Sequence, residues 1–557
     1  MNWDELREKH MPTLEQALEA VRTRTFYAHW AEVPSGKIYG ETAHEDGRRR
    51  FEGLLHKPFQ EWLQQGDGEW VGGEISPYGF PLGVHYRRLS VATAVERAQR
   101  AQRQWQRLDG RTRAVLLLEA LEQAAAEFFP LAYATMHTTG QGFVMAFQAS
   151  GPHAFDRALE AIATGVMALE GFAPEVLWRK PLGKGEIAVR KRFQAVPKGL
   201  GAVIGCSTFP VWNAFPGVFA NLITGNACLW KPHPTVMLPV ALVVARLQRA
   251  LESLGIDPNV LLMLPCTLEE PLTWEVVEHP AVRIVDYTGS PAFGTELERR
   301  LGGKVVFTEK AGVNSVLLHS VADLGAVLDN LAFSLCLYSG QMCTAPQNIF
   351  VPETGVETPD GRLLPEEVAA RLCAAIDALV HNPKAGPPTL GALQNEQTLQ
   401  RLRQAEALGL PVLRASTPLD HPDYPDARTA TPLLLEARQG EHRQVYGREW
   451  FGPIAFLVRS PSADSALQEM AALVRSAGAL VTAVYTTEEA FKRQAADLLT
   501  EAGTSVAFNF VGPVWVNQSA AYSDFHGAGV NAAGNASFTD LGYVAARFGI
   551  VHVREVV

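Results

Sequence analysis

The sequence is poor in cysteine and has no long apolar run. Its 557 residues include six cysteines, none of them in a CxxC pair, so neither a disulfide framework nor a thiolate zinc cluster is expected. The start of the chain is polar and lacks the basic and apolar segments of a signal peptide. No apolar stretch is long enough to span a membrane. We therefore expect a cytoplasmic protein without a metal site.

The chain also lacks an excess of positive charge. Its formal net charge is -10 and its sequence pI is about 5.9, which makes nucleic acid and anionic membrane surfaces unfavourable partners. The composition, 47% hydrophobic and 19% charged, is that of a globular protein. A chain of this length predicts two or three domains rather than a single core.

Strands and helices are predicted to alternate from Gly199 onward. Short apolar segments separated by helical patterns predict a parallel sheet with helices on its faces, that is, a Rossmann-type α/β domain. The predicted strands are 201–205, 226–231, 260–263, 282–285 and 305–308, and the predicted helices are 215–222, 236–254 and 293–301.

This alternation divides the chain into domains. Residues 1–84 have a helical, amphipathic pattern without a chemical motif and are interpreted as a packing extension. A nucleotide-binding domain is predicted over 85–308 and a catalytic α/β domain over 309–506. A charged, alternating segment at about 183–199 predicts a hairpin that interrupts the first domain. Residues 507–557 return along the molecule and end in a predicted strand.

Two reactive side chains stand 34 positions apart, Glu309 within 307–315 and Cys343 within 339–345. A thiol can attack a carbonyl carbon, and a carboxylate of raised pKa can activate the water that releases the product. Taken alone, Cys343 would be a small buried residue and Glu309 a surface carboxylate. In these contexts we expect a helix N-terminus to lower the pKa of Cys343, and burial at a strand end to raise the pKa of Glu309.

A glycine-containing turn precedes Glu309 by 20 residues. Gly289 and Gly294, with Ser290 between them, permit a tight connection from a strand to a helix, whose N-terminus can receive a pyrophosphate. Many turns share this pattern, so it is weak by itself. Its position before Glu309 favours nucleotide binding.

Taken in order, these motifs resemble those of the aldehyde dehydrogenase superfamily. The resemblance implies a Rossmann-type cofactor domain, an α/β catalytic domain and a β oligomerisation arm built from the hairpin and the C-terminal strand. It therefore also implies a homodimer or homotetramer. The matching segments are 225–232, 289–294, 309–312, 340–343 and 449–453.

The resemblance implies roles at the nucleotide site. Lys231 would reach the adenosine ribose, Glu449 would bind the nicotinamide ribose and Phe451 would pack on the nicotinamide ring. Ile204 and Ser207 would line the same site.

The choice between NADP and NAD turns on one departure from the family. Members often have a glutamate three residues after the lysine, where it binds the ribose 2′-hydroxyl, but this chain has Pro234. Without that carboxylate nothing repels a 2′-phosphate, so Lys231 and His233 would favour NADP over NAD. The alternative for His233 is a loop histidine with no role.

A second departure concerns the oxyanion. The family usually has an asparagine 23 residues before the lysine, but this chain has Thr208 there. Thr208 keeps a hydroxyl donor of shorter reach, and loss of one such donor costs about 3 kcal/mol in other enzymes. Asn213 lies five residues later, so it restores the family's sequence motif but not the spacing of that motif from Lys231. Either Thr208 serves, or the loop differs, or catalysis is weakened.

The resemblance implies oxidation of an aldehyde to an acid. The Cys343 thiolate attacks the aldehyde, the Cys343 N–H and Thr208 hold the oxyanion, and hydride leaves to the nucleotide. Water activated by Glu309 then releases the acid. The segment 206–213 and the N-terminal extension are most similar to a bacterial branch of phenylacetic acid degradation, which implies a CoA-linked semialdehyde at the ring-opening stage.

Three alternatives stay open. The first is a general semialdehyde or aromatic aldehyde dehydrogenase, and the second is a CoA-acylating dehydrogenase. The third is a non-catalytic subunit, for which Thr208 is the only support.

Overall fold

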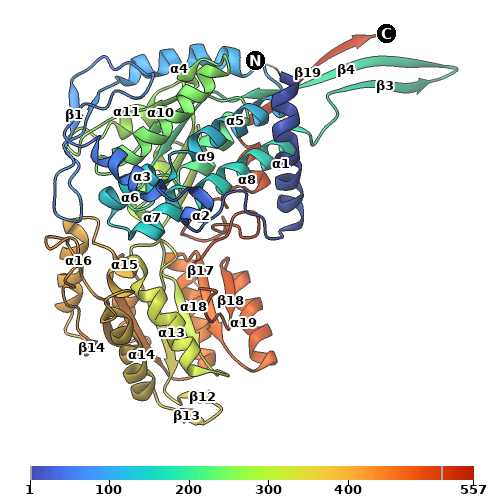
Figure 1. Cartoon of the computed structure of the whole chain (residues 1–557). Coiled ribbons are helices and arrows are strands. Elements are labelled where there is room, and N and C mark those ends of the chain that lie inside the picture. The colour runs from blue at the N-terminus through green and yellow to red at the C-terminus, as the bar shows by residue number, and fades with distance from the viewer. Residues whose placement is uncertain (1–2, 516–517) are drawn as a thin grey trace.

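The computed structural model describes residues 3–515 and 518–557. Two lobes lie one above the other, each built on its own sheet, and a long β arm projects from the upper lobe (Figure 1). The N-terminal helices belong to the upper lobe, and the C-terminus ends on the arm. Within the described residues, no helix combines the length and apolar character that crossing a membrane requires.

The N-terminal region packs into the core of the upper lobe. Leu14, Leu18 and Val21 of the first helix are buried in the same apolar cluster as the strands of the cofactor sheet. The extension is only partly helical, because 54–84 is mostly irregular. It contains β1 (Trp70–Gly72), which pairs antiparallel with β2 (His85–Arg87).

Eight helices precede the arm in the described chain. They are α1 (Trp3–Thr23), α2 (Gly36–Tyr39), α3 (Ala43–Glu52), α4 (Val91–Trp105), α5 (Gly110–Ala125), α6 (Phe128–Thr139), α7 (Phe143–Ser150) and α8 (Pro152–Leu169).

The upper lobe contains the predicted parallel sheet, with strand order β7-β6-β5-β8-β9. All five predicted strands are confirmed. Apolar side chains of β5, β6, β7 and β8 lie in one buried cluster, and Val306 of β9 packs against it. The strands are β5 (Leu200–Ile204), β6 (Cys228–Lys231), β7 (Leu261–Met263), β8 (Val282–Gly289) and β9 (Val305–Lys310). The helices of this segment are α9 (Phe215–Ile223), α10 (Met237–Ser253), α11 (Thr273–Glu278) and α12 (Pro291–Arg300).

Strand β9 crosses the predicted boundary between the two domains. Its pairing with β8 continues to Gly289 and Lys310, so Glu309 lies on the cofactor sheet and not at the start of the catalytic domain. The predicted division after residue 308 cuts this strand, because the sequence pattern does not reveal how far the ladder continues.

The lower lobe is built on a seven-stranded sheet of order β14-β15-β16-β11-β10-β17-β18. Within the described residues of this sheet, the β14–β15 pair is antiparallel and the other pairs are parallel. The strands are β10 (Ser315–Leu318), β11 (Asn348–Pro352), β14 (Val412–Arg414), β15 (Leu433–Arg438), β16 (Ile454–Ser460), β17 (Val481–Tyr485) and β18 (Ser505–Phe508), and β12 (Val356–Thr358) pairs separately with β13 (Gly361–Leu363).

Helices of the catalytic segment cover the lower sheet. They are α13 (Leu324–Cys336), α14 (Pro365–Val380), α15 (Gly386–Leu390), α16 (Glu396–Glu406), α17 (Arg443–Tyr446), α18 (Ala463–Ala477) and α19 (Glu489–Glu501).

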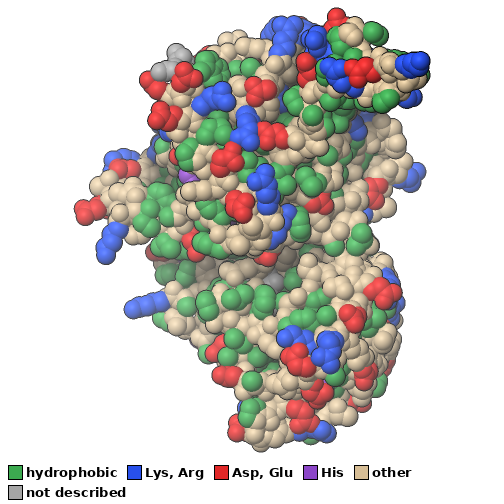
Figure 2. All heavy atoms as spheres, turned by 90° about the vertical axis from the view of Figure 1, so that its right-hand side faces the viewer, with side chains coloured by type: hydrophobic (Ala, Val, Ile, Leu, Met, Phe, Trp, Pro, Cys, Tyr) green, Lys and Arg blue, Asp and Glu red, His purple; other side chains and the backbone are tan. Residues whose placement is uncertain are grey.

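The arm is a three-stranded antiparallel sheet of order β19-β4-β3. The sequence predicted a hairpin at about 183–199, but β3 (Glu175–Leu182) and β4 (Gly185–Pro197) place its first strand earlier. β19 (Phe548–Val556) pairs with β4, as the resemblance implied. Basic, acidic and hydrophobic side chains stand together at the top of the face in Figure 2, where the arm faces the viewer. Its exposed large apolar residues include Val176, Leu177, Trp178, Leu182, Ile187, Ile550, Val551 and Val553.

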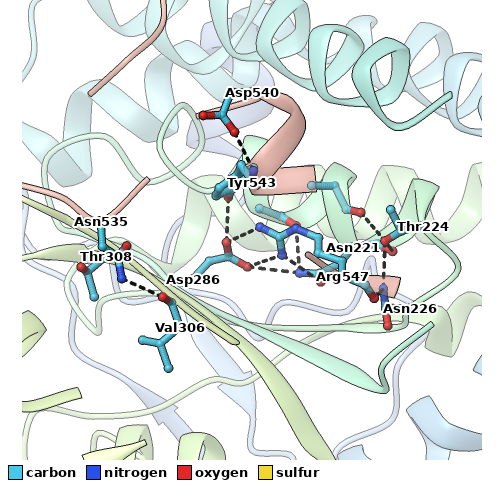
Figure 3. Close-up of polar contacts among 12 residues, drawn as sticks. Asn221, Thr224, Asn226, Asp286, Val306, Thr308, Asn535, Asp540, Tyr543 and Arg547 are labelled. Carbon is cyan, nitrogen blue, oxygen red and sulfur yellow. Dashed lines mark hydrogen bonds and ion pairs between the residues drawn. The ribbon is translucent and has the colours of Figure 1, made fainter. Parts of the chain in front are cut away.

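Buried polar contacts fix the C-terminal return on the cofactor sheet (Figure 3). Arg547, which follows α20 (Leu541–Ala545), donates to both carboxylate oxygens of Asp286 on β8, at 2.6 and 2.8 Å. Asn535 accepts from the Thr308 backbone and donates to the Val306 carbonyl, both at 2.8 Å. The return is therefore held along the free edge of β9, the strand that carries Glu309.

Candidate active site

Cys343 lies in a strained loop after α13. Tyr338, Ser339 and Gly340 have consecutive φ values of 51°, 49° and 66°, a left-handed run that is costly for the two non-glycine residues. A Cβ on Gly340 would lie 2.4 Å from the Gly452 carbonyl oxygen. Such strain persists only where the surroundings enforce it, and it is typical of functional loops.

Asn314 holds this loop against the catalytic sheet. Its Nδ2 donates to the carbonyl oxygens of Cys343 at 2.8 Å and Ala345 at 3.0 Å. Its Oδ1 accepts from the backbone N–H groups of Leu480 and Val481. One buried amide thus fixes the nucleophile loop to the beginning of β17.

Glu309 ends in a cluster of hydrogen-bond donors between the two lobes. Its Oε1 accepts from Nε2 of His526 at 2.7 Å. Its Oε2 accepts from Nδ2 of Asn213 at 2.6 Å and from the Thr288 hydroxyl at 3.1 Å. The Cys343 thiol also hydrogen-bonds to this carboxylate. The structure therefore brings the two predicted reactive side chains into direct contact.

The predicted raised pKa of Glu309 is wrong. Burial by itself raises the pKa of this carboxyl, but the charge of His526 and hydrogen bonds from His526, Cys343 and Thr288 outweigh it. The pKa of Glu309 therefore lies below its ordinary value. Sequence reasoning foresaw the burial and missed the donors, which come from distant segments.

The predicted lowered pKa of Cys343 is also wrong. Cys343 follows the short 3-10 turn Leu337–Gly340 and lies in a further turn, not at a helix N-terminus. Burial, followed by the charge of Glu309, raises its pKa well above the ordinary value. The resting group is a thiol, and it needs a base to become a nucleophile.

His526 is a site residue that sequence reasoning missed. Its Nε2 lies 3.7 Å from Sγ of Cys343 as well as 2.7 Å from Glu309. The ring is buried between Trp212, edge-on at 4.8 Å, and Phe538 at 5.5 Å. A single histidine 183 positions after the cysteine carries no local motif, so only the tertiary structure could reveal it.

Asn213, which the sequence count set aside, also belongs to the site. Residues 210–214 form a turn before α9, and this turn carries the Asn213 amide to Glu309. Thr208 is one residue further from Glu309: its carbonyl accepts from Gln141, and its hydroxyl bonds with the thiol of Cys206, which lies near Glu309. Counting positions did not reveal the contact of Asn213 with Glu309, and the assignment of the oxyanion donor to Thr208 stays a prediction.

Glu309, Cys343 and His526 form a hydrogen-bonded group. The potential ligand atoms of Glu309, Cys343 and His526 lie within 4.8 Å of one another. Nitrogen and oxygen ligands of a tetrahedral zinc ion are about 3.3 Å apart, whereas Nε2 and Oε1 are separated by 2.7 Å. The absence of a metal stays a prediction of the sequence.

A small cavity of about 10 Å³, room for about one water molecule, lies where the chain order of the cofactor sheet reverses, between β5 and β8. Ile204, Gly205, Asn213 and Thr288 are among the residues that line it. Nucleotides bind at such switch points, at the carboxyl ends of the strands. Ser207 follows in the loop after β5, on the same side of the sheet.

The predicted pyrophosphate turn connects β8 to α12. Gly289 ends the strand and Ser290 is the N-cap of the helix, without a side-chain capping bond. A Cβ on Gly294 would lie 2.7 Å from the Lys310 side chain, so this glycine lets α12 pack closely on β9. The first turn of α12 offers backbone donors suited to a phosphate.

Lys231 and His233 lie at the end of β6. Burial lowers the pKa of Lys231, whose ammonium bonds to Cys266. Burial, followed by the Lys231 charge, lowers the pKa of His233 to about 4, and its Nδ1 contacts the Thr235 hydroxyl at 2.8 Å. His233 is therefore neutral near pH 7, which removes the second positive charge expected to favour a 2′-phosphate.

Glu449 and Phe451 lie in the turn that packs against the nucleophile loop through Gly452 and Gly340. Burial raises the pKa of Glu449 to about 7, partly offset by Arg401. The Phe451 carbonyl accepts from the same arginine. Three groups together fit a dinucleotide: the Glu449 carboxyl for ribose hydroxyls, the Lys231 ammonium, and the backbone N–H groups in the first turn of α12.

A family model described as the aldehyde dehydrogenase family matches residues 85–539. Among solved structures, the chain is similar to an NAD-dependent aldehyde dehydrogenase from Burkholderia multivorans. The two are 42% identical, the alignment covers 99% of each chain, and the TM-score is 0.96. The predicted fold class is thereby confirmed. Because the match covers nearly the whole chain, it includes the N-terminal extension and the arm.

Curated relatives match a shorter part. The alpha-aminoadipic semialdehyde dehydrogenase of Rattus norvegicus is 27% identical over 277 residues, 47% of each chain. The N-succinylglutamate 5-semialdehyde dehydrogenase of Paraburkholderia xenovorans is 28% identical over 298 residues, 52% of this chain and 57% of that protein. The chain thus spans about half the length of the curated relatives it matches.

Proposed function

We propose that this chain, which belongs to the aldehyde dehydrogenase family, oxidises an aldehyde to a carboxylic acid with a nicotinamide dinucleotide as hydride acceptor. The observation that carries the proposal is the contact between the Cys343 thiol and the Glu309 carboxylate beside a nucleotide-type switch point. When bound, the nicotinamide supplies the redox chemistry.

The chain's own residues divide the work in the following way. The Cys343 thiol must lose its proton to react, and the Glu309 carboxylate, its hydrogen-bond partner, receives that proton although the high thiol pKa opposes the transfer. Sγ then attacks the aldehyde carbon, and the Cys343 N–H stabilises the oxyanion. After oxidation the acyl group is a thioester on Sγ. Once Glu309 has released the thiol proton to solvent, it removes a proton from the water that releases the acid.

The second oxyanion donor is Thr208 by sequence reasoning, and Asn213 is a rival because of its place beside Glu309. Thr208→Ala and Asn213→Ala separate them. The variant that removes the true donor lowers kcat by about 100-fold or more. The other variant changes kcat less.

Two arguments on the nucleotide oppose each other. Pro234 leaves no carboxylate to repel a 2′-phosphate, which favours NADP. The neutral state of His233 and the NAD-dependent relative at 42% identity favour NAD. We propose that NAD is accepted, and the ratio of kcat/KM for NAD and NADP decides whether NADP is preferred.

The proposed substrate class is a semialdehyde, since the two curated relatives described above are among those named for semialdehydes. The finer proposal is a CoA-linked semialdehyde at the ring-opening stage of phenylacetic acid degradation, as in the protein PaaN, which the extension and the segment 206–213 resemble. A general semialdehyde or aromatic aldehyde dehydrogenase is the alternative. No nucleic acid or membrane partner is proposed, and a cytoplasmic location stays a prediction.

The arm supports a homodimer or homotetramer. Both β3 and β19 are exposed and carry apolar side chains that a second copy would cover. Light scattering of the whole chain, and of a variant with Trp178 and Val553 changed to serine, tests this proposal. A wild-type monomer would overturn it.

The central test is the rate of nicotinamide reduction by wild type and Cys343→Ala over a panel of aldehydes, including CoA-linked semialdehydes, with NAD and NADP in parallel. Cys373→Ala is the matched control, since that cysteine lies in α14, outside the site. We expect turnover in wild type and the control and none in Cys343→Ala. If wild type binds nucleotide but oxidises no aldehyde, the proposal is contradicted and the non-catalytic alternative is favoured.

A further inference from the structure

His526 touches both reactive groups of the site through one atom. Its Nε2 lies 2.7 Å from Glu309 Oε1 and 3.7 Å from Cys343 Sγ. A carboxylate has no proton to donate, so Nε2 carries the proton of the shorter contact. The imidazole is almost completely buried, so it contacts Glu309 instead of water.

The loop that carries His526 is held by residues from the other end of the chain. Arg24, just after α1, donates to the Tyr522 carbonyl at 3.1 Å, and its guanidinium lies 3.6 Å from the Phe525 ring centre. Tyr27 packs edge-on against Tyr522 at 5.0 Å. The N-terminal extension therefore contacts the residue next to His526.

Helix α8 also contacts the loop that carries His526. The fully buried Arg157 donates to the Asp524 carbonyl at 3.0 Å and to the Ser519 hydroxyl at 2.7 Å. Glu160 accepts from Arg157 at 2.7 Å and from Arg24 at 3.3 Å. One buried carboxylate thus connects the two arginines that fix the loop.

We propose that His526 is a positioning residue for the general base Glu309, and that the N-terminal extension keeps it in place through Arg24. This inference rests on the proposed function and assigns a task to the extension. The Nε2–H group holds one carboxylate oxygen, while Asn213 and Thr288 hold the other. The carboxylate is thereby kept ionised and fixed in orientation.

Among residues 3–515 and 518–557, the titratable groups that face Glu309 are His526, Cys343 and Cys206, whose thiol is also affected by the Glu309 charge. Burial raises the pKa of Glu309, and the His526 charge lowers it. Removing the imidazole therefore leaves burial unopposed, and protonation of the carboxyl begins at a higher pH.

The test reads the ionisation of Glu309 directly and needs no turnover. Infrared difference spectra over a pH series detect the protonated carboxyl, and the band missing in Glu309→Gln belongs to Glu309. We expect the band midpoint of His526→Phe to lie at least about one pH unit above that of wild type. His526→Gln keeps an N–H donor and restores part of the shift. An unchanged midpoint in His526→Phe overturns the proposal.

Matched controls isolate the histidine and the arginine. His381→Phe, an exposed histidine after α14, leaves the midpoint unchanged. Arg24→Ala shifts it in the same direction by a smaller amount, whereas the exposed Arg22→Ala does not. Thermal melting checks that each variant is folded, and Arg24→Lys replaces Arg24→Ala if the latter does not fold. A folded Arg24 variant without a shift overturns the role of the extension.

Turnover gives a second, separate readout. In His526→Phe, the pH at which kcat falls on the acidic side moves upward together with the infrared midpoint, because hydrolysis needs ionised Glu309. A shifted midpoint in an enzyme that oxidises no aldehyde would contradict the proposed function and leave the His526–Glu309 relationship intact.

Discussion

The Nε2 atom of His526 lies 2.7 Å from Oε1 of Glu309, although 217 positions separate the two residues. The contact joins the C-terminal return to the edge strand of the cofactor sheet. It opposes the effect of burial on Glu309, and the same carboxylate raises the pKa of Cys343. The reactivity of the Cys343 thiol therefore depends on the ionisation of Glu309, and that ionisation depends on His526, which lies outside the strand that carries Glu309.

The first prediction concerns the Cys343 thiol. Its pKa is raised by burial and by the Glu309 charge, so its alkylation by iodoacetamide accelerates as pH rises above neutrality. Glu309→Gln removes the charge, lowers the thiol pKa and increases alkylation near pH 7. Peptide mass spectrometry measures the rate at Cys343, with Cys373 as internal reference. Slower alkylation in Glu309→Gln would contradict this prediction and would mean that proton transfer to the carboxylate, which the proposed mechanism uses in the attack on the aldehyde, outweighs the effect of its charge on the thiol pKa.

The second prediction concerns nucleotide affinity. Burial raises the pKa of Glu449 to about 7, and the ionised form is the stronger acceptor for ribose hydroxyls. As pH falls through about 7 the carboxyl becomes protonated, so we expect Kd for the nucleotide to rise. Calorimetric titrations between pH 6 and pH 8, at roughly equal spacing around this pKa, measure the change. Glu449→Gln should bind weakly and independently of pH in this range.

The third prediction concerns the left-handed turn before Cys343. Gly340→Ala introduces a Cβ at φ +66°, 2.4 Å from the Gly452 carbonyl oxygen. Strain of this kind costs about 1–3 kcal/mol, and the clash displaces the nucleophile loop. We expect a larger loss of kcat than of unfolding free energy.

Gly409→Ala is the matched control for Gly340→Ala, since Gly409 has φ +73° and open space around its Cβ position. Kinetics and urea unfolding compare the two variants. Equal effects in both would show that backbone strain alone, without the contact to Gly452, accounts for the loss.

The fourth prediction concerns the buried ion pair of Figure 3. Arg547→Met leaves Asp286 charged and buried without its partner, which costs about 3–5 kcal/mol of unfolding free energy. Arg547→Met with Asp286→Asn recovers much of that loss, because no buried charge remains. Urea unfolding measures both, with the exposed Arg475→Met as control. If Arg547→Met alone were as stable as wild type, the proposed contribution of the Arg547–Asp286 ion pair to stability would be contradicted.

Sequence reasoning was sufficient for the features that depend on local pattern. The alternation of apolar strands and helices after Gly199 predicted the cofactor sheet, because strands buried on both faces need continuous apolar runs. The glycines at 289 and 294 predicted a tight turn into α12, where the structure has one. Glu309 and Cys343 were singled out from short motifs, and the fold brings them together.

Sequence reasoning failed where residues meet across long separations. It set Asn213 aside by counting positions, but a turn before α9 moves this amide to Glu309. It predicted the wrong direction for the pKa shifts of Glu309 and Cys343. A pKa reflects all neighbouring charges and donors, which here include His526 from a distant loop.

The sequence by itself determined the family, the parallel sheet and the two reactive side chains, since strand pattern and motif spacing are local properties of a chain. Only the tertiary structure decided which side chains surround them, how their protons are shared, and that the N-terminal extension contacts the loop of His526. These outcomes depend on burial and on distances between atoms, and such distances are fixed only when the whole chain is packed.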